Sequence, residues 1–196
     1  MQKDERKAEV LCDFFSSVFC TENDTVFPVL SHKECDAAST PPNFDLDDII
    51  NRLKKLNINK SPGPDSIHPR ILYETADQIA YPLKLIFESC FYNKCLPSEW
   101  KYANITPIYK KGSRSDPGYY RPVSLTSIVC KLMESIIRDS IMAHFKTNKL
   151  FTNKQFGFIK GRSTTLQLLQ ILDKWTELLE SGGQVDVVYT DLEKSI

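Results

Sequence analysis

A run of cations in the middle of the chain has the composition of a phosphate-binding hairpin. Lys110 and Lys111 precede Gly112, and Arg121 follows a short loop at the start of an extended segment. Lysine supplies a mobile point charge, whereas the guanidinium of arginine grips two phosphate oxygens at once. Three tyrosines on which bases can stack lie beside these cations: Tyr109, Tyr119 and Tyr120. The pattern indicates nucleic-acid or phosphate binding, and the alternative is a charged surface hairpin with tyrosines packed at its base.

A second basic and aromatic segment, Gln155–Thr165, opens a predicted helix. Its two glycines allow backbone amides and the helix N-terminus to approach a nucleic-acid phosphate. The alternative is a helix-capping loop in which Ser163 or Thr164 caps the helix. In that case Phe156 or Phe158 belongs to the core.

A single carboxylate, Asp191, ends the β-branched run that begins at Val185. A carboxylate that leaves a buried strand commonly holds a divalent metal at the edge of a sheet. Phosphoryl transfer uses metal ions to neutralise charge and align the attacking oxygen, and a two-metal site needs several carboxylates. Among the carboxylates of this segment, only Asp191 directly ends the predicted strand. An aspartate that caps the next turn explains the residue equally well.

Apolar spacing predicts that mostly helices position these segments. Helices are expected over residues 5–20, from 45 to the turn at 60–65, from 69 to about 93, over 127–146 and over 164–181. Asp45 is suited to cap the second helix and Pro69 to begin the third. Pro82 should kink or split that third helix. Gly182 and Gly183 should end the last one.

Two segments are predicted as strands. Residues 102–109 indicate a strand that Pro107 confines to an edge or irregular position. Residues 185–191 are predicted as a buried strand, which needs partners from the chain's own hairpin or from further strands; we favour further strands. Residues 21–43 are predicted as a linker. The expected fold class is α/β (α+β) and helix-rich.

The formal charge is zero but unevenly distributed. Residues 1–50 carry 4 lysines and arginines against 11 acidic residues, and residues 51–196 carry 21 against 14. A basic excess suits a polyanionic partner, although solvated lysines also explain it. The six irregularly spaced cysteines are expected to be reduced thiols. Neither a transmembrane helix nor a secretory signal is expected, which favours an intracellular protein of the nucleus or cytoplasm.

Motifs recur along nearly the whole chain in one fixed order. They are residues 7–19, Lys-Ser-Pro-Gly-Pro-Asp-Ser-Ile at 60–67, Leu-Pro-Ser-Glu-Trp at 96–100, Ile-Thr-Pro-Ile-Tyr-Lys-Lys-Gly at 105–112, Tyr-Arg-Pro-Val-Ser-Leu at 120–125, the segment 155–165, and Tyr-Thr-Asp-Leu-Glu-Lys at 189–194. This series resembles the reverse transcriptases of non-LTR (LINE-type) retrotransposons, in particular the jockey-like and chicken-repeat-like groups.

The resemblance implies the fingers of a right-hand polymerase and the start of its palm. Residues 1–43 would be a helical linker segment before the polymerase, 44–184 the fingers, and 185–196 the first, truncated palm strand. The implied partners are an RNA template, a DNA primer and deoxynucleoside triphosphates, with no membrane. In the complete enzyme the primer 3′-hydroxyl would attack the α-phosphate of the nucleotide and release pyrophosphate.

The resemblance also implies a role for each site residue. Lys110 or Lys111, together with Arg121, would approach the triphosphate of the incoming nucleotide. The template and the templating base would be held by Gln155, Gly157, Phe158 and Arg162. Asp191 would bind the catalytic Mg²⁺ ions, with the carbonyl of Leu192 as a further oxygen ligand.

The sequence departs from the family pattern near Asp191. The family usually continues Asp-Leu-x-Lys-Ala-Phe-Asp, whereas Ser195 and Ile196 stand here at the alanine and phenylalanine, and Ile159 stands where an arginine is general. The sequence contains no Phe/Tyr-x-Asp-Asp segment, so we expect this polypeptide alone not to polymerise DNA. Two alternatives are a non-catalytic nucleic-acid-binding remnant and a decayed transposon product that folds poorly.

Overall fold

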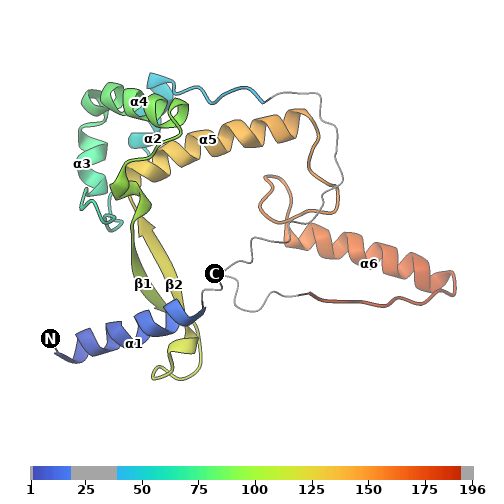
Figure 1. The fold of residues 1–196 in the computed structure, drawn as a ribbon. Coiled ribbons are helices and arrows are strands. Elements are labelled where there is room, and N and C mark those ends of the chain that lie inside the picture. The colour runs from blue at the N-terminus through green and yellow to red at the C-terminus, as the bar shows by residue number, and fades with distance from the viewer. Residues whose placement is uncertain (1, 19–38, 191–196) are drawn as a thin grey trace. The chain divides into compact units, whose positions relative to one another are not determined.

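The computed structural model describes residues 2–18 and 39–190 (Figure 1). Its helices are α1 (Gln2–Val18), α2 (Leu46–Leu53), α3 (Pro69–Glu74), α4 (Ala76–Tyr92), α5 (Ile128–Thr147) and α6 (Thr164–Glu180). Two short 3-10 helices, η1 (Ser98–Lys101) and η2 (Pro117–Tyr119), flank a hairpin of strands β1 (Ala103–Tyr109) and β2 (Tyr120–Thr126). The chain forms two compact units, residues 1–143 and 144–196, and each is considered by itself. The fold is a helix-rich α+β arrangement, as the sequence predicts.

Local capping signals set several helix boundaries. The carboxylate of Asp45 accepts a hydrogen bond from the backbone N–H of Asp48 at 3.1 Å, so Asp45 caps α2 as predicted. Pro69 is the first residue of α3, where its missing N–H costs nothing. At α6 the Ser163 hydroxyl accepts a hydrogen bond from the Leu166 N–H at 3.2 Å. Ser163 is therefore the cap that the sequence left open between two candidates.

The end of α6 is also the predicted one. Gly182 has a φ of +78°, a left-handed conformation that glycine adopts without strain. The N–H of Gly183 then donates to the carbonyl of Leu178 at 2.9 Å and satisfies an end group of the helix.

Pro82 does not split the helix, one of the two outcomes that the sequence predicts for it. Helix α4 continues through Pro82, and the interruption lies instead at Thr75, between α3 and α4. The ring of Pro82 removes the hydrogen bond to Gln78, but both residues are exposed, so water can reach that carbonyl. At Thr75 both the backbone N–H and the hydroxyl donate to the carbonyl of Ile71, at 3.0 and 2.7 Å.

The hydrophobic core joins α2, α3, α4 and α5. Its fully buried aromatic centre is Phe87, whose ring centroid lies 5.9 Å from that of Phe44 and 6.1 Å from that of Trp100. The buried cluster consists of Phe44, Ile49, Leu53, Leu72, Ala76, Ala80, Leu83, Phe87, Cys90, Val129, Leu132, Met133 and Ile136. The hairpin projects away from the helices that form this core (Figure 1).

A guanidinium links α2 to α5 at the edge of this core. Arg52 pairs with Asp48 and with Asp139, each at 2.8 Å, and donates to the Ser135 hydroxyl at 2.9 Å. Burial alone would lower the pKa of Arg52, but the hydrogen bonds to the two carboxylates outweigh it and raise that pKa. Burial alone would raise the pKa of Asp139, but hydrogen bonds from Arg138 and Arg52 outweigh it and lower that pKa.

The turn at 60–65 packs directly against the foot of β2. A Cβ atom added at Gly63 would lie 2.6 Å from the carbonyl oxygen of Thr126 and 2.8 Å from the backbone nitrogen of Ser127. Only glycine fits this approach, because both neighbours are backbone atoms. The turn therefore fixes the point at which β2 passes into α5.

The hairpin accommodates two facing prolines without losing ladder hydrogen bonds. Strands β1 and β2 are antiparallel, with Pro107 opposite Pro122 and Tyr109 opposite Tyr120. The Lys110 N–H donates to the Tyr119 carbonyl at 2.8 Å, and hydrogen-bonded pairs alternate with non-hydrogen-bonded pairs from there. The proline pair thus falls where neither N–H would face the other strand. The sequence prediction that Pro107 lies on an edge strand is confirmed.

The prediction of a buried strand over residues 185–191 was wrong for its described part. Residues 185–190 have no strand assignment, and Val188 and Tyr189 expose 84% and 88% of their surface. A strand needs a hydrogen-bonded neighbour, and within residues 2–18 and 39–190 the sheet consists of β1 and β2 alone.

Candidate nucleotide- and nucleic-acid-binding site

The cations predicted to bind phosphate lie on the hairpin. Lys110 and Lys111 begin the connection between the strands, here called the hairpin tip (residues 110–119), and Arg121 lies in β2 opposite Ile108. All three side chains are exposed. The structure thus gathers this group on one hairpin in the first compact unit.

Tyrosines and one glycine determine the shape of the hairpin tip. Gly112 has a φ of +87°, and a Cβ atom there would lie 2.6 Å from the ring of Tyr119. The rings of Tyr109 and Tyr120 meet edge to face with centroids 5.6 Å apart, and the Arg114 guanidinium lies 5.3 Å from the Tyr109 ring centroid. These tyrosines pack within the hairpin, as expected for the alternative of a charged surface hairpin with packed tyrosines.

Strand alternation separates the two faces of the hairpin. Arg121, Val123 and Leu125 point to one face, whereas Tyr120 and Ser124 point to the other. Val123, Ser124 and Leu125 line a cleft of about 890 Å³ at the foot of the hairpin. Leu125 lies roughly 13 Å along the strand from Arg121, at about 3.3 Å per residue, so the cleft begins one short strand away from the hairpin cations.

This cationic cleft was missed by sequence reasoning. Its basic lining residues are Arg52, Lys55, Lys60, Lys131 and Arg138, and no acidic residue lines it within the described part of the chain. Its apolar floor includes Leu56, Ile128 and Leu132, and Asn57 and Ser61 add polar groups. The basic excess of residues 51–196 was the one available signal, but it did not show which cations converge.

The cations of the cleft differ in how far their charge is neutralised. Arg52 is paired with two aspartates, and Arg138 is paired with Asp139 at 2.8 Å. Lys55, Lys60 and Lys131 are exposed, and the described residues provide no ion-pair partner for them. These three ammonium groups are thus available to an external anion.

The predicted template-binding residues lie in the second compact unit. The guanidinium of Arg162 donates to the carbonyls of Thr152 (2.7 Å) and Gln155 and lies 5.8 Å from the Phe156 ring centroid. Arg162 therefore holds the loop together. The side chain of Phe158 is fully exposed, and its backbone has a φ of +62°.

The two other predicted members of this loop have open surroundings. Nothing lies within 4 Å of a Cβ atom placed on Gly157, and the exposed side chain of Gln155 reaches the Gly157 carbonyl at 3.5 Å. The loop thus presents Gln155, Gly157 and Phe158 outward while Arg162 is engaged internally. The capping alternative is confirmed for Ser163, whereas Phe158 does not enter a core.

The predicted metal ligands Asp191 and Leu192 lie outside the described residues. Among residues 2–18 and 39–190, no three His, Cys, Asp or Glu side chains gather closely enough to hold a metal ion. The described residues alone therefore do not fit a Mg²⁺ site. In the same ranges no helix combines the length and the hydropathy needed to cross a membrane.

The first compact unit thus has a helix-rich α+β fold, from which a basic hairpin projects. A cationic cleft lies at the foot of this hairpin. No protein-family model matches the chain. The RNA-directed DNA polymerase from the mobile element jockey of Drosophila melanogaster is 30% identical over 151 residues, which are 76% of this chain and 16% of that protein. A probable RNA-directed DNA polymerase from transposon BS of the same species is 27% identical over 151 residues, 76% of this chain and 17% of that protein.

A third relative broadens the group. The retrovirus-related Pol polyprotein from the type-1 retrotransposable element R1 of Bradysia coprophila is 28% identical over 130 residues, which are 65% of this chain and 13% of the polyprotein. The resemblance to non-LTR retrotransposon reverse transcriptases is therefore confirmed, and the chain is a relative of these RNA-directed DNA polymerases. It spans less than one fifth of the length of the curated relatives that it matches.

Proposed function

We propose that this chain is the template- and nucleotide-holding part of an RNA-directed DNA polymerase. Residues 44–184 would be the fingers of a right-hand polymerase, residues 1–43 the segment before it, and residues 185–196 the start of the palm. The partners would be an RNA template, a DNA primer and deoxynucleoside triphosphates, in the nucleus or cytoplasm. The observation that carries the proposal is the cationic cleft at the foot of the basic hairpin, in a chain related to such polymerases.

The hairpin and the cleft would take different phosphates. The hairpin cations Lys110, Lys111 and Arg121 would hold the triphosphate of a nucleotide, because lysine and arginine charges at one end of a hairpin suit a compact polyanion. The cleft would take the backbone of a nucleic-acid strand. Its three lysines that have no ion-pair partner among the described residues are spread over two segments, and its floor is apolar, which suits phosphates alternating with sugars and bases.

The loop of the second unit would contact the template through its outward groups. Gln155 and Phe158 offer an amide and an exposed ring, and Gly157 leaves room for close approach. Arg162 would act by holding the loop in shape. We further propose Mg²⁺ as the metal bound by Asp191 and the Leu192 carbonyl; it would neutralise charge on the triphosphate. That proposal rests on the resemblance of residues 189–194 alone.

A charge-neutralising triple variant tests the cleft. In Lys55→Gln/Lys60→Gln/Lys131→Gln, the affinity for a fluorescein-labelled single-stranded RNA should fall, and the slope of log K against log salt should shrink by about 2, at roughly 0.7 per lost phosphate contact. Fluorescence anisotropy from low to moderate salt measures both quantities. A DNA oligonucleotide of the same sequence shows whether the cleft prefers RNA.

Two control variants make this test specific. The triple Lys→Arg variant at the same positions keeps the charges and should bind as the wild type does. A second triple, Lys84→Gln/Lys94→Gln/Lys101→Gln, removes the same charge from residues that do not line the cleft. Equal losses in the two Gln triples would refute the cleft as the strand-binding site. Nucleotide binding is tested separately with Lys110→Gln/Lys111→Gln and fluorescent dATP, whose affinity should fall.

A further inference from the structure

Helix α1 lies against the hairpin tip, although the two are about 100 residues apart in sequence. Its apolar side chains are spaced for one helical face: Val10, Leu11, Phe14, Phe15 and Val18. Phe15 is 93% buried, with 7% of its surface exposed. Figure 1 shows α1 beside the end of the hairpin that is remote from the core helices. Contacts between α1 and η2 make the hairpin tip a packing partner of this helix.

The contact between α1 and the tip is centred on η2. The Cζ atom of Phe14 would lie 3.7 Å from a methyl group placed on Gly118, which is ordinary van der Waals contact. The Gly118 N–H donates to the carboxylate of Asp116 at 2.8 Å, which holds η2 in shape. Because this hydrogen bond ties Gly118 to Asp116, packing of Phe14 beside Gly118 also restrains the rest of the turn.

The η2 turn also contacts the segment that carries the two lysines proposed to bind a triphosphate. The Lys110 N–H donates to the carbonyl of Tyr119, the last residue of η2, at 2.8 Å. The ring of Tyr119 also packs on Gly112, which follows Lys111. A displacement of η2 would therefore move the backbone of both lysines.

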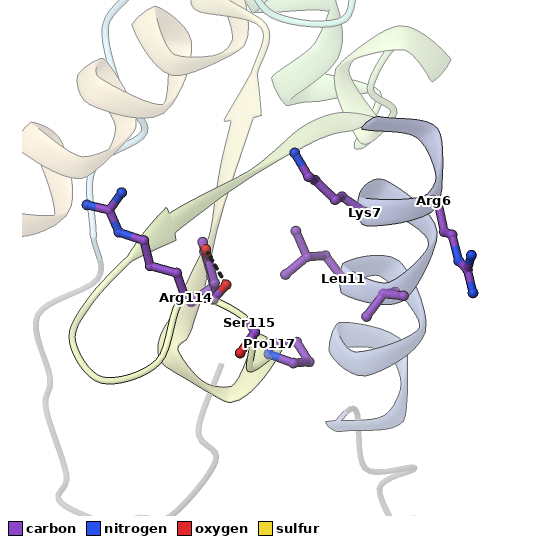
Figure 2. A pocket seen from close by; sticks show the side chains of 8 residues that line it. Arg6, Lys7, Leu11, Arg114, Ser115 and Pro117 are labelled. Atoms are coloured by element: carbon purple, nitrogen blue, oxygen red, sulfur yellow. Dashed lines mark hydrogen bonds between the residues drawn. The ribbon is translucent and has the colours of Figure 1, made fainter. Parts of the chain in front are cut away.

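The space between α1 and the tip is a cavity of about 660 Å³ with an apolar middle. Leu11 and Pro117 line it from opposite sides, and Tyr120 lines it from β2. Figure 2 shows Leu11 directed toward the tip, whereas Arg6 and Arg114 extend away from the space. The cations at its rim do not converge, so this arrangement suits packing of the helix and not capture of an anion.

Helix α1 lies beside the face of the hairpin that carries Tyr120. Tyr120 lines the cavity beside α1, and strand alternation directs its neighbour Arg121 to the other face. Helix α1 thus packs on one face of the hairpin, and Arg121 stays exposed. An isolated two-stranded hairpin is only marginally stable, so such support matters for the geometry of its tip.

We propose that α1 is a brace for the hairpin tip, and that Phe14 and Leu11 are positioning residues whose packing sets the affinity of Lys110 and Lys111 for a nucleoside triphosphate. The part concerning the triphosphate rests on the proposed function. The brace itself does not, because it concerns the order of residues 110–119 whatever they bind.

Phe14→Ala in the full chain tests the brace. Hydrogen exchange followed by mass spectrometry should show faster exchange in the hairpin tip, including the Lys110 amide, and unchanged exchange in α4. The Kd for fluorescent dATP should rise roughly 3- to 30-fold, the range for residues that act through packed neighbours. Phe14→Leu should restore both values because it retains an apolar contact. Ser16→Ala, on the exposed side of α1, should leave both unchanged.

The outcomes separate the brace from the proposed function. Unchanged exchange in the tip of Phe14→Ala overturns the brace, even if the wild type binds dATP. Faster exchange with an unchanged Kd overturns the positioning role. If the wild type does not bind dATP, the nucleotide function and the positioning role fail together, whereas exchange still decides the brace. Leu11→Ala, which removes less apolar surface, gives the same readouts if Phe14→Ala does not fold.

Discussion

Substitution of Gly63 by alanine gives a sharp test of how the fold supports the site. The added methyl group would lie 2.6 Å from the Thr126 carbonyl oxygen, 2.7 Å from the Thr126 carbonyl carbon and 2.8 Å from the Ser127 nitrogen. Favourable contacts between heavy atoms lie at about 3.5–4.0 Å, so the turn or the foot of β2 must move by roughly 1 Å. Both are backbone segments, and no side-chain rotation relieves the clash.

The expected cost follows from two opposing terms. Overpacking of this kind costs about 1–3 kcal/mol. Replacing glycine also restricts the unfolded chain, which stabilises the protein by about 0.4–1 kcal/mol. Because the three nearest atoms all belong to the backbone of Thr126 and Ser127, we expect the upper part of the range and a net loss of about 2 kcal/mol. For a chain of this size that lowers Tm by roughly 4–8 °C.

The assay is thermal unfolding followed by the fluorescence of Trp100, which packs on Phe87 in the core. A Trp175→Phe background leaves Trp100 as the only tryptophan of the chain. The matched control is Gly157→Ala, where nothing lies within 4 Å of the added Cβ atom, and its Tm should equal or slightly exceed that of the wild type because only the unfolded-chain effect remains. Equal Tm values for Gly63→Ala and Gly157→Ala would refute the reasoning. The Gly63→Ala protein should also bind single-stranded RNA less tightly, since the cleft borders this turn.

Three further predictions follow from single contacts. Arg52→Gln should lower the free energy of unfolding by about 1–3 kcal/mol, because it removes charged hydrogen bonds; urea unfolding measures this. The pKa of Asp139 is lowered in the folded protein, partly by Arg52. The difference in Tm between the wild type and Arg52→Gln should therefore be largest above the unfolded pKa of about 3.9 and become smaller as the pH falls below it. A difference in Tm that grows on acidification would contradict this. Burial, with Glu134 nearby, raises the pKa of the Cys130 thiol to about 11, so at pH 8 iodoacetamide should label exposed Cys95 well before Cys130, as read by peptide mass spectrometry.

Much of the helical framework could be predicted because its signals are local. Apolar spacing located the helical regions, although α2 ends at Leu53 and not at the turn at 60–65, and the third region is divided at Thr75 and not at Pro82. The two short 3-10 helices were not predicted. Caps such as Asp45 depend on neighbours three residues away, so they are legible in the sequence. The hairpin followed from extended segments on both sides of Lys110. These features need no knowledge of the tertiary fold.

The parts that could not be predicted depend on contacts between distant segments. The cationic cleft joins Lys60 to Lys131, which are 71 positions apart, and no pattern in either segment announces the other. The packing of Phe14 on η2 is of the same kind. The strand expected after Val185 failed because β-branched composition indicates a preference, whereas a strand exists only where a neighbour supplies hydrogen bonds. The roles of Gln155, Gly157, Phe158 and Arg162 stay predictions.

The facing prolines of the hairpin have a consequence for what this element can join. At a non-hydrogen-bonded pair the backbone groups of both strands point outward, toward whatever lies along the two free edges. Pro107 and Pro122 remove an outward N–H from each edge at the same level. A third strand, from this chain or from another copy, would lose a hydrogen bond on whichever edge it approached. The hairpin therefore resists growth into a larger sheet, and its outer surfaces stay available to helices and to ligands.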